Sequence, residues 1–177
     1  MGLIIESGTG NGASAAVTDD NRLDVSSRTT PRIAYVSKDD GQSFTWSHFY
    51  DYDAADTILL LSNSSTTKKL YIDTIFVGSD TATRFTVHSP AYPTLAGTLV
   101  TGTNTNRSSG NIADAEAYGD ETGNTQANVI AHGMVVGTGT IGLMPNGTII
   151  LGYHDCIAVD LVTAGAMGTV TIAGYFE

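Results

Sequence analysis

Short apolar runs alternate with short polar breaks along residues 57–89. Ile58–Leu61 is a compact apolar run, Asn63–Thr67 is rich in turn-forming residues, and Leu70–Val77 carries β-branched and aromatic side chains. Apolar runs of about four to eight residues between turn signals are typical of β-strands. No stripe of apolar residues at helical spacing fits this segment, so the pattern predicts an all-β fold.

The same pattern continues from Arg32 to the last residues of the chain. Pro90 and Pro93 mark a loop, because proline lacks the N–H that a central strand donates. We expect an antiparallel β-sandwich or jelly roll of about eight to ten strands, the last three forming a meander. The predicted strands are Arg32–Ser37, Ser43–Tyr50, Thr57–Ser62, Lys69–Val77, Thr81–Ser89, Thr98–Thr103, Gln126–Val136, Thr148–Tyr153, Cys156–Thr163 and Gly168–Phe176.

The connecting segments carry more specific expectations. The polar stretch Asn104–Asn124 predicts a long loop with one helical turn around Ile112–Tyr118. Gly133 lies inside a predicted strand and indicates a β-bulge. Residues 137–148 form a turn-rich link, in which Asn146–Gly147 is a dipeptide favoured in tight β-hairpins and predicts a hairpin turn.

Residues 1–30 differ from the rest of the chain, because glycine recurs at alternate positions from Gly8 to Gly12. Two short strand-like runs then flank the polar sequence TDDN, which predicts a β-hairpin. We expect residues 1–30 to be an N-terminal arm that attaches the protein to a neighbouring subunit or scaffold, with a frayed strand pair as the alternative. Residues 31–177 are expected to form one β-sandwich domain.

Composition and charge narrow the classes of partner. The chain has 177 residues, 41% hydrophobic and 15% charged, which is too apolar for a disordered chain. No apolar run approaches the roughly 20 residues of a transmembrane helix, and the first residues lack the pattern of a secretory signal. The net charge is −10, and about 70 residues after Arg107 contain no cation. Because nucleic acids and anionic membranes are bound by clustered Lys and Arg, we expect neither as a partner.

Cys156 is the only cysteine, so no disulfide forms within the chain. It lies in the apolar run CIAVDLV, and we expect it to be a small buried side chain. A nucleophilic role beside His154 is the alternative, although no activating cation lies near it in the sequence.

The remaining candidate chemistry is weak. Asp51, Asp53 and Asp56 match only the first positions of a calcium-binding loop, so a solvated turn is expected. The aromatic residues near Trp46 suggest either a sugar-stacking surface or, as we expect, core on one face of a strand. The other aromatic residues of that group are Phe44, Tyr50 and Tyr52. Four histidines are scattered along the chain without the spacing of a metal site: His48, His88, His132 and His154. Three N-x-S/T triplets begin at Asn63, Asn106 and Asn146. We therefore expect no catalytic, cofactor-binding or metal-binding residues.

Three segments carry a resemblance to structural proteins of tailed-bacteriophage virions. GTGNGASAAVTDDNRLDV resembles a short element near the start of phage head and tail accessory proteins. LLLSNSSTTKKLYIDTIFVGSD and CIAVDLVTAGAMGTVTIAGYFE resemble strands of jelly-roll capsid decoration (cement) proteins. The resemblance implies a non-enzymatic, commonly oligomeric β-sandwich on the outside of a capsid, with no catalytic residues to transfer.

We therefore expect a capsid decoration protein that binds the major capsid protein on the outer head surface and stabilises the shell. It would be made in the host cytoplasm and would self-associate as a homotrimer or, alternatively, a homodimer. A second hypothesis is a tail, baseplate or head-fibre component that contacts host surface glycans through Asn104–Asn124 and the aromatics near Trp46. A third is a sugar-active or cupin-type enzyme.

Overall fold

The computed structural model describes residues 31–52, 57–93, 95–121, 124, 126–162 and 166–177, without the side chains of residues 50–52 and 166. The chain divides into two compact units, Met1–Pro31 and Arg32–Glu177. The hairpin predicted within residues 1–30 therefore lies outside the described residues.

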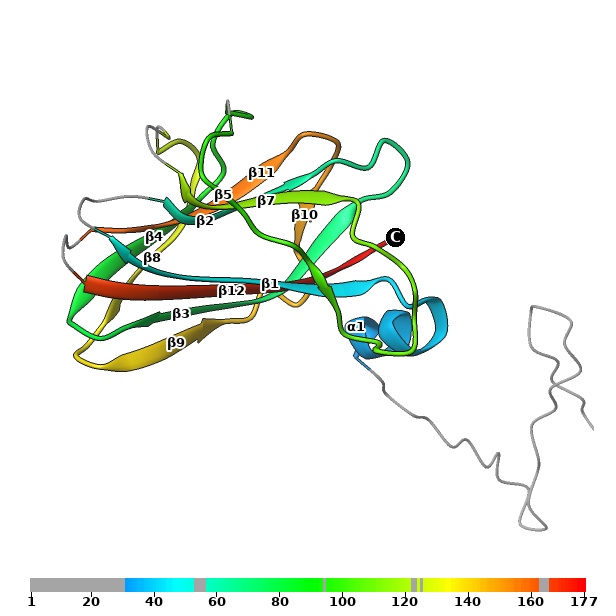
Figure 1. Cartoon of the computed structure of the whole chain (residues 1–177), viewed down its shortest axis with the longest axis horizontal. Helices are drawn as coiled ribbons and strands as arrows, with labels where there is room; N and C mark the ends of the chain where they lie inside the picture. The colour runs from blue at the N-terminus through cyan, green and yellow to red at the C-terminus, as the bar shows by residue number, and fades with distance from the viewer. Residues whose placement is uncertain (1–30, 53–56, 94, 122–123, 125, 163–165) are drawn as a thin grey trace, which may run out of the picture. The chain divides into compact units, whose positions relative to one another are not determined.

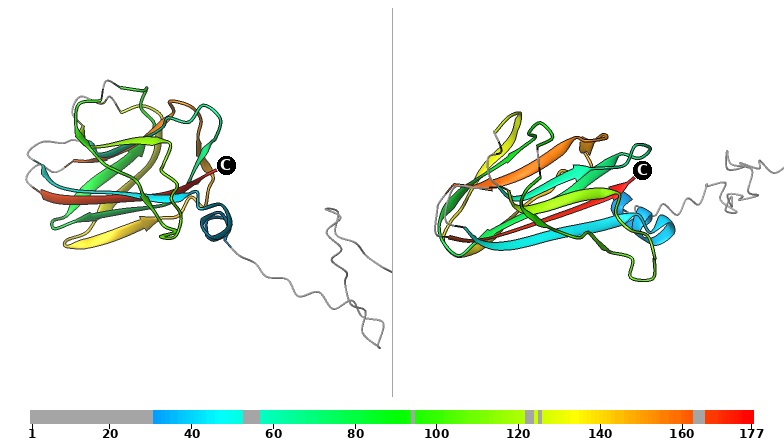
Figure 2. Two further views of the ribbon diagram at one scale, coloured as in Figure 1. Left: turned by 45° about the vertical axis from the view of Figure 1, so that its right-hand side comes forward. Right: turned by 45° about the horizontal axis from the view of Figure 1, so that its top comes forward.

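Two antiparallel sheets pack against each other, which confirms the all-β sandwich (Figure 1). The first, here called the β1 sheet, contains β1 (Ser43–Tyr52), β3 (Leu70–Ser79), β6 (Thr103–Asn104), β9 (Gly139–Leu143), β10 (Ile149–Leu151) and β12 (Ala166–Phe176). The second, the β2 sheet, contains β2 (Thr57–Asn63), β4 (Thr83–His88), β5 (Thr98–Leu99), β7 (Ala115–Glu121), β8 (Val129–Val135) and β11 (Cys156–Leu161). Both layers can be followed in the two rotated views of Figure 2.

The pairing is that of a jelly roll. Strand β1 pairs with β12, β2 with β11, β3 with β9 and β10, and β4 with β8. The first half of the chain thus pairs with the second half in reverse order, while successive pairs alternate between the two sheets. The predicted meander of the last three strands is wrong, because β10 and β12 lie in the β1 sheet and β11 lies in the β2 sheet.

The core lies between the sheets. Phe44 and Trp46 project inward from β1 and are fully buried, and Phe44 also meets Phe176 edge-on with ring centroids 5.8 Å apart. Strands β2 and β11 are buried along their whole length. Full burial of one large apolar side chain contributes roughly 1.5–3 kcal/mol, so these two layers supply the main folding force.

The segment predicted as a strand at Arg32–Ser37 is helical instead. An α-helix, α1 (Arg32–Tyr35), continues into a short π-helix, η1 (Val36–Asp40), and Gly41 ends it with φ +61° and an N–H bond to the carbonyl of Val36. Proline often precedes a helix, and glycine often follows its last residue. Pro31 and Gly41 are therefore the sequence signals for the start and the end of this helical segment. No helix in the described part of the chain is long and apolar enough to cross a membrane.

The helical turn predicted around Ile112–Tyr118 is also wrong, because β7 is a strand. It alternates Ala117 and Gly119 inward with Glu116 and Tyr118 outward. These two inward residues are small, and the third buried position of β7 is the polar Glu121, so the period of two carries little hydrophobicity and is easily missed in the sequence. The predicted strand Thr98–Thr103 is divided between β5 and β6, which belong to different sheets.

Asn146 and Gly147 form a turn but do not reverse the chain. Both have positive φ, 51° and 77°, as the dipeptide predicts. However, β9 and β10 on either side both pair with β3, with Leu143 opposite Ile75 and Ile149 opposite Ile72. The turn therefore joins two strands that run in the same direction along the same edge of β3. The link predicted to be rich in turns contains the strand β9.

Candidate functional site

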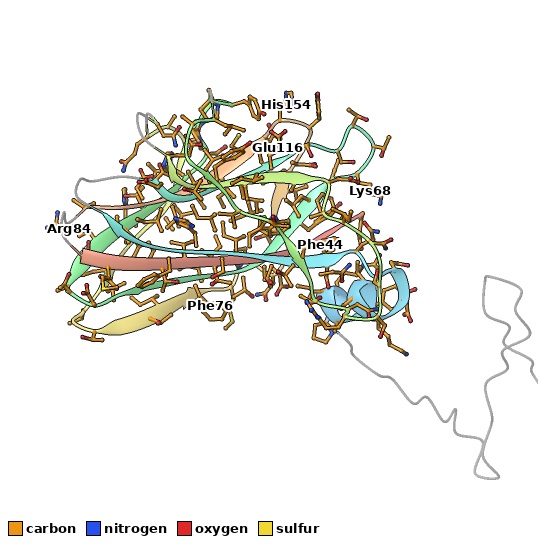
Figure 3. All side chains as sticks on the ribbon, viewed as in Figure 1. Phe44, Lys68, Phe76, Arg84, Glu116 and His154 are labelled. Carbon is orange, nitrogen blue, oxygen red and sulfur yellow. The ribbon has the colours of Figure 1, made fainter. Side chains whose placement is uncertain are left out.

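The outer face of the β2 sheet carries most of the chemically active side chains. On β4, Phe85 and Val87 point into the core, so the alternate residues Thr86 and His88 point outward. The same alternation places Asp160 of β11 on this outer face, beside β4. Figure 3 labels Arg84 of β4, at the left of the view, which also points outward because it alternates with Phe85.

Asp160 is the centre of a polar cluster. Its Oδ1 accepts a hydrogen bond from the Thr57 hydroxyl (2.7 Å), and its Oδ2 accepts one from the Gln126 amide (2.9 Å). The Nε2 of His88, which is fully buried, lies 3.0 Å from the same Oδ2. That distance suits an ion pair, but neither ring nitrogen of His88 makes a hydrogen bond of good geometry with a described residue. The cluster therefore holds the carboxylate in place rather than exposing it as a free base.

A pocket of about 650 Å³ opens beside this cluster. Its walls carry one cationic, one carboxylate, two amide, one hydroxyl and one imidazole side chain, from Arg84, Asp160, Asn124, Gln126, Thr86 and His132. Such a lining offers hydrogen-bond donors and acceptors to a polar ligand. No three metal-ligating side chains converge within the described residues.

The four histidines do not converge. His132 is exposed and shares a hydrogen bond with the Thr86 hydroxyl (3.2 Å), while His88 belongs to the Asp160 cluster. The ring of His48 faces Gly119, and burial lowers the pKa of His48 below 6.5, although the nearby charge of Asp120 partly opposes this shift.

The fourth histidine belongs to an exposed aromatic stack. His154 has φ +62° and lies between Tyr92 and Tyr153, with ring centroids 4.3 Å and 3.8 Å away. Both tyrosines are about half exposed, and the Tyr92 hydroxyl donates to the Glu116 carboxylate (2.6 Å). That hydrogen bond is the main reason that the pKa of Tyr92 rises to about 12. Figure 3 labels His154 and Glu116 close together at the top of the molecule.

Cys156 is fully buried, as the sequence predicts, and burial raises the pKa of its thiol. A thiol held protonated is a poor nucleophile. Phe44 and Trp46 are fully buried, so the core interpretation of these two aromatics is confirmed. The side chains of Tyr50, Tyr52 and the acidic residues 51, 53 and 56 lie outside the described part of the chain.

The asparagines of the three N-x-S/T triplets support turns. Asn63 is buried and donates to the carbonyls of Lys68 and Leu151, while Asn106 donates to the Ser37 carbonyl. Asn146 belongs to the turn before β10. The side chains of Asn63 and Asn106 and the backbone conformation of Asn146 therefore each stabilise a turn.

The outer face of the β1 sheet differs in character and was not predicted. Three adjacent cross-strand rows of this face carry no charged side chain: Thr45–Ala173–Thr74; Ser47–Thr171–Phe76–Gly142; Phe49–Thr169–Gly78–Thr140. We call these residues the neutral face. Phe49 and Phe76 are 59% and 42% exposed at its surface, and Figure 3 labels Phe76 on the lower side of the molecule. The signal in the sequence was the run of Thr and Ser at alternate positions of β1 and β12.

Comparison with known proteins finds no matching family model, no significantly similar curated protein and no significantly similar solved structure. The geometry of the two outer faces is therefore the basis on which a function is inferred.

Proposed function

We propose that this chain is a non-enzymatic virion structural protein, a capsid decoration protein that binds the major capsid protein on the outer head surface and stabilises the shell. The observation that carries the proposal is the neutral face on a jelly-roll body. A chain with net charge −10 would ordinarily expose charges on every face, since charged side chains keep surfaces apart. Three adjacent uncharged rows across four strands, bearing two exposed phenylalanines, suit a permanent assembly contact.

Residues 1–30, which lie in the separate unit Met1–Pro31, are the proposed attachment arm. Residues 1–30 are proposed to bind the major capsid protein, and the jelly roll to stand on the shell. An acidic body also suits docking on a basic surface patch.

A second candidate is binding of host surface glycans by a tail or head-fibre component. The observation that favours it is the exposed stack of Tyr92, His154 and Tyr153, because aromatic faces stack on the apolar faces of sugar rings. In this alternative the stack takes the role that the sequence had suggested for Trp46, which is buried in the core. A glycan array probed with the wild-type chain and with Tyr153→Ala tests this candidate.

The deciding experiment is quantitative mass spectrometry of purified virus particles, with copies of this chain counted against the major capsid protein. A protease other than trypsin is required, because the chain has no Lys or Arg after Arg107. A copy number in simple ratio to the capsid lattice is expected. Copy numbers of a few to a few dozen would assign the chain to a tail or vertex, and absence from the particle would overturn the proposal.

A further inference from the structure

Two rows of side chains on the outer face of the β2 sheet line the pocket beside Asp160. Thr86 of β4 is paired with Asp160 of β11 on one side and with His132 of β8 on the other, so these three residues form one row. Arg84 lies two residues away along β4, about 7 Å, and points to the same face. All four residues line the cavity of about 650 Å³.

Two amide side chains between β7 and β8 also line the pocket, and their partners fix their orientation. The Gln126 amide donates to the Asp160 carboxylate (2.9 Å), which only accepts. The Asn124 amide donates to the Thr57 hydroxyl (3.1 Å), whose own hydrogen is given to Asp160. In both amides the NH₂ group is therefore engaged, and the carbonyl oxygen remains an acceptor without a partner among the described residues.

The strands supply the donors. The guanidinium of Arg84 is exposed and makes no hydrogen bond or ion pair with a described residue, although the chain has 18 acidic residues. Arg84 is also the only Lys or Arg in the six strands of the β2 sheet. The Nδ1 of His132 shares a hydrogen bond with the Thr86 hydroxyl (3.2 Å), which leaves Nε2 for a ligand.

We propose that this pocket binds a sugar that carries one carboxylate, a uronic acid, with the carboxylate on Arg84 and ring hydroxyls on the amide oxygens of Asn124 and Gln126. A guanidinium can bind a carboxylate through two parallel hydrogen bonds. Sugar hydroxyls both donate and accept, and the lining offers partners of both kinds. The cavity is within the usual size of small-molecule sites. This inference goes beyond the decoration role and does not depend on it.

Charge favours a single carboxylate over a phosphate or a neutral sugar. Arg84 is the only Lys or Arg among the described lining residues, and the Asp160 carboxylate belongs to the same lining. A phosphate, with a charge near −2, would meet that carboxylate with one guanidinium to balance it. A neutral sugar would leave the guanidinium without an anion.

Isothermal titration calorimetry of the full chain with glucuronate and galacturonate, at constant ionic strength, tests the proposal. We expect at least one of the two to bind at one site per chain, more tightly than glucose, acetate or glucose 6-phosphate. Arg84→Gln should raise the dissociation constant about tenfold or more, because a charge-assisted pair is lost. Arg84→Lys should fall between this variant and wild type, since lysine keeps the charge without the planar fork.

Arg107→Gln is the matched control, because it removes the same charge from an exposed arginine outside the pocket. It should bind the uronate like wild type, and circular dichroism should be unchanged in all three variants. Figure 3 labels Arg84 well apart from His154, so the pocket and the Tyr92–His154–Tyr153 stack are separate surfaces. In NMR spectra the uronate should shift the ring signals of His132 and leave those of His154 in place.

Four outcomes would overturn the proposal. The first is no binding of either uronate at about 10 mM, and the second is unchanged binding by Arg84→Gln. The third is binding of acetate or glucose as tight as that of the uronate, which would reduce the pocket to an anion site or a neutral sugar site. The fourth is tighter binding of glucose 6-phosphate. None of these results requires virus particles, so failure here is distinguishable from failure of the decoration role.

Discussion

Glycines lie directly against inward-facing rings at three places in this fold. A Cβ would lie 2.5 Å from the Trp46 indole at Gly102, and 2.3 Å from the His48 ring at Gly119. At Gly133 it would lie 2.3 Å from the Phe85 ring. The bulge that the sequence predicts at Gly133 is wrong, because Gly133 pairs regularly with Phe85 and the register of this ladder shifts between Val87 and His88. Gly133 provides space for a ring on the neighbouring strand, which is a tertiary requirement.

Gly133→Ala is therefore expected to destabilise the fold by about 1–3 kcal/mol, since the new methyl overpacks the core against Phe85. Urea unfolding followed by fluorescence of the single tryptophan, Trp46, measures this change. Gly110→Ala is the control, because no atom lies within 4 Å of its added Cβ. Equal stability of the two variants would show that Phe85 moves aside freely.

His48 is expected to make stability depend on pH. Its pKa in the folded chain is lowered below 6.5, mainly by burial, so the unfolded chain binds a proton first as the pH falls. The free energy of unfolding that the neutral His48 ring contributes is therefore fully present above about pH 6.5. It is lost as the pH falls from there through the pKa of His48 in the folded chain.

Urea unfolding at about pH 7.5 and about pH 5 tests this dependence. His48→Gln should lose less stability than wild type between the two pH values, because glutamine does not titrate. His132→Gln serves as the control, since His132 is exposed, and should keep the wild-type dependence. An unchanged slope in His48→Gln would contradict the assignment.

At the scale of elements, residues 144–148 separate β9 from β10 without changing the strand that they follow. The amides of Asn146 and Gly147 donate to the carbonyls of Asp73 and Ile72 on β3, at 3.0 Å and 2.8 Å. The inserted turn is thus held to its neighbour and keeps β10 in register. The dipeptide predicted the backbone conformation correctly, but the direction of the chain beyond it depends on pairing with β3.

Gly147→Ala is expected to cost about 1–2 kcal/mol, because a side chain at φ +77° is strained and its Cβ would approach the Tyr175 hydroxyl at 2.7 Å. Hydrogen exchange should show faster exchange of the β10 amides, with the central strands little affected. Gly139→Ala in β9 is the control, because its nearest atom is 4.0 Å away. Unchanged protection of β10 in Gly147→Ala would show that the turn does not hold this strand.

At the scale of the whole molecule, every strand pairing among the described residues lies within residues 43–176. The guanidinium of Arg32 forms an ion pair with the Glu177 carboxylate, and the backbone of Glu177 pairs with Lys69, so both ends of the unit Arg32–Glu177 are held to it. This unit contains its own core and the partners of all its described strands.

Deletion of residues 1–30 should therefore leave the jelly roll folded, with its urea unfolding midpoint close to that of the full chain. In the proposed decoration role, binding to undecorated capsids should be lost. Cosedimentation with capsids and circular dichroism of the truncated protein measure the two expectations. A truncated protein that still decorates capsids would contradict the attachment role of the arm.

The sequence by itself determined the all-β class and the positions of β1 to β4, because short apolar runs bounded by turn-forming residues are a local property. It also identified the buried state of Phe44, Trp46 and Cys156. Only the tertiary structure decided which sheet each strand joins, since partners such as Ser43 and Tyr175 lie far apart along the chain. The neutral face and the Tyr92–His154–Tyr153 stack depend on that pairing, because each brings together residues from distant strands or loops. No local pattern records such neighbours, which is why the sequence did not reveal either surface.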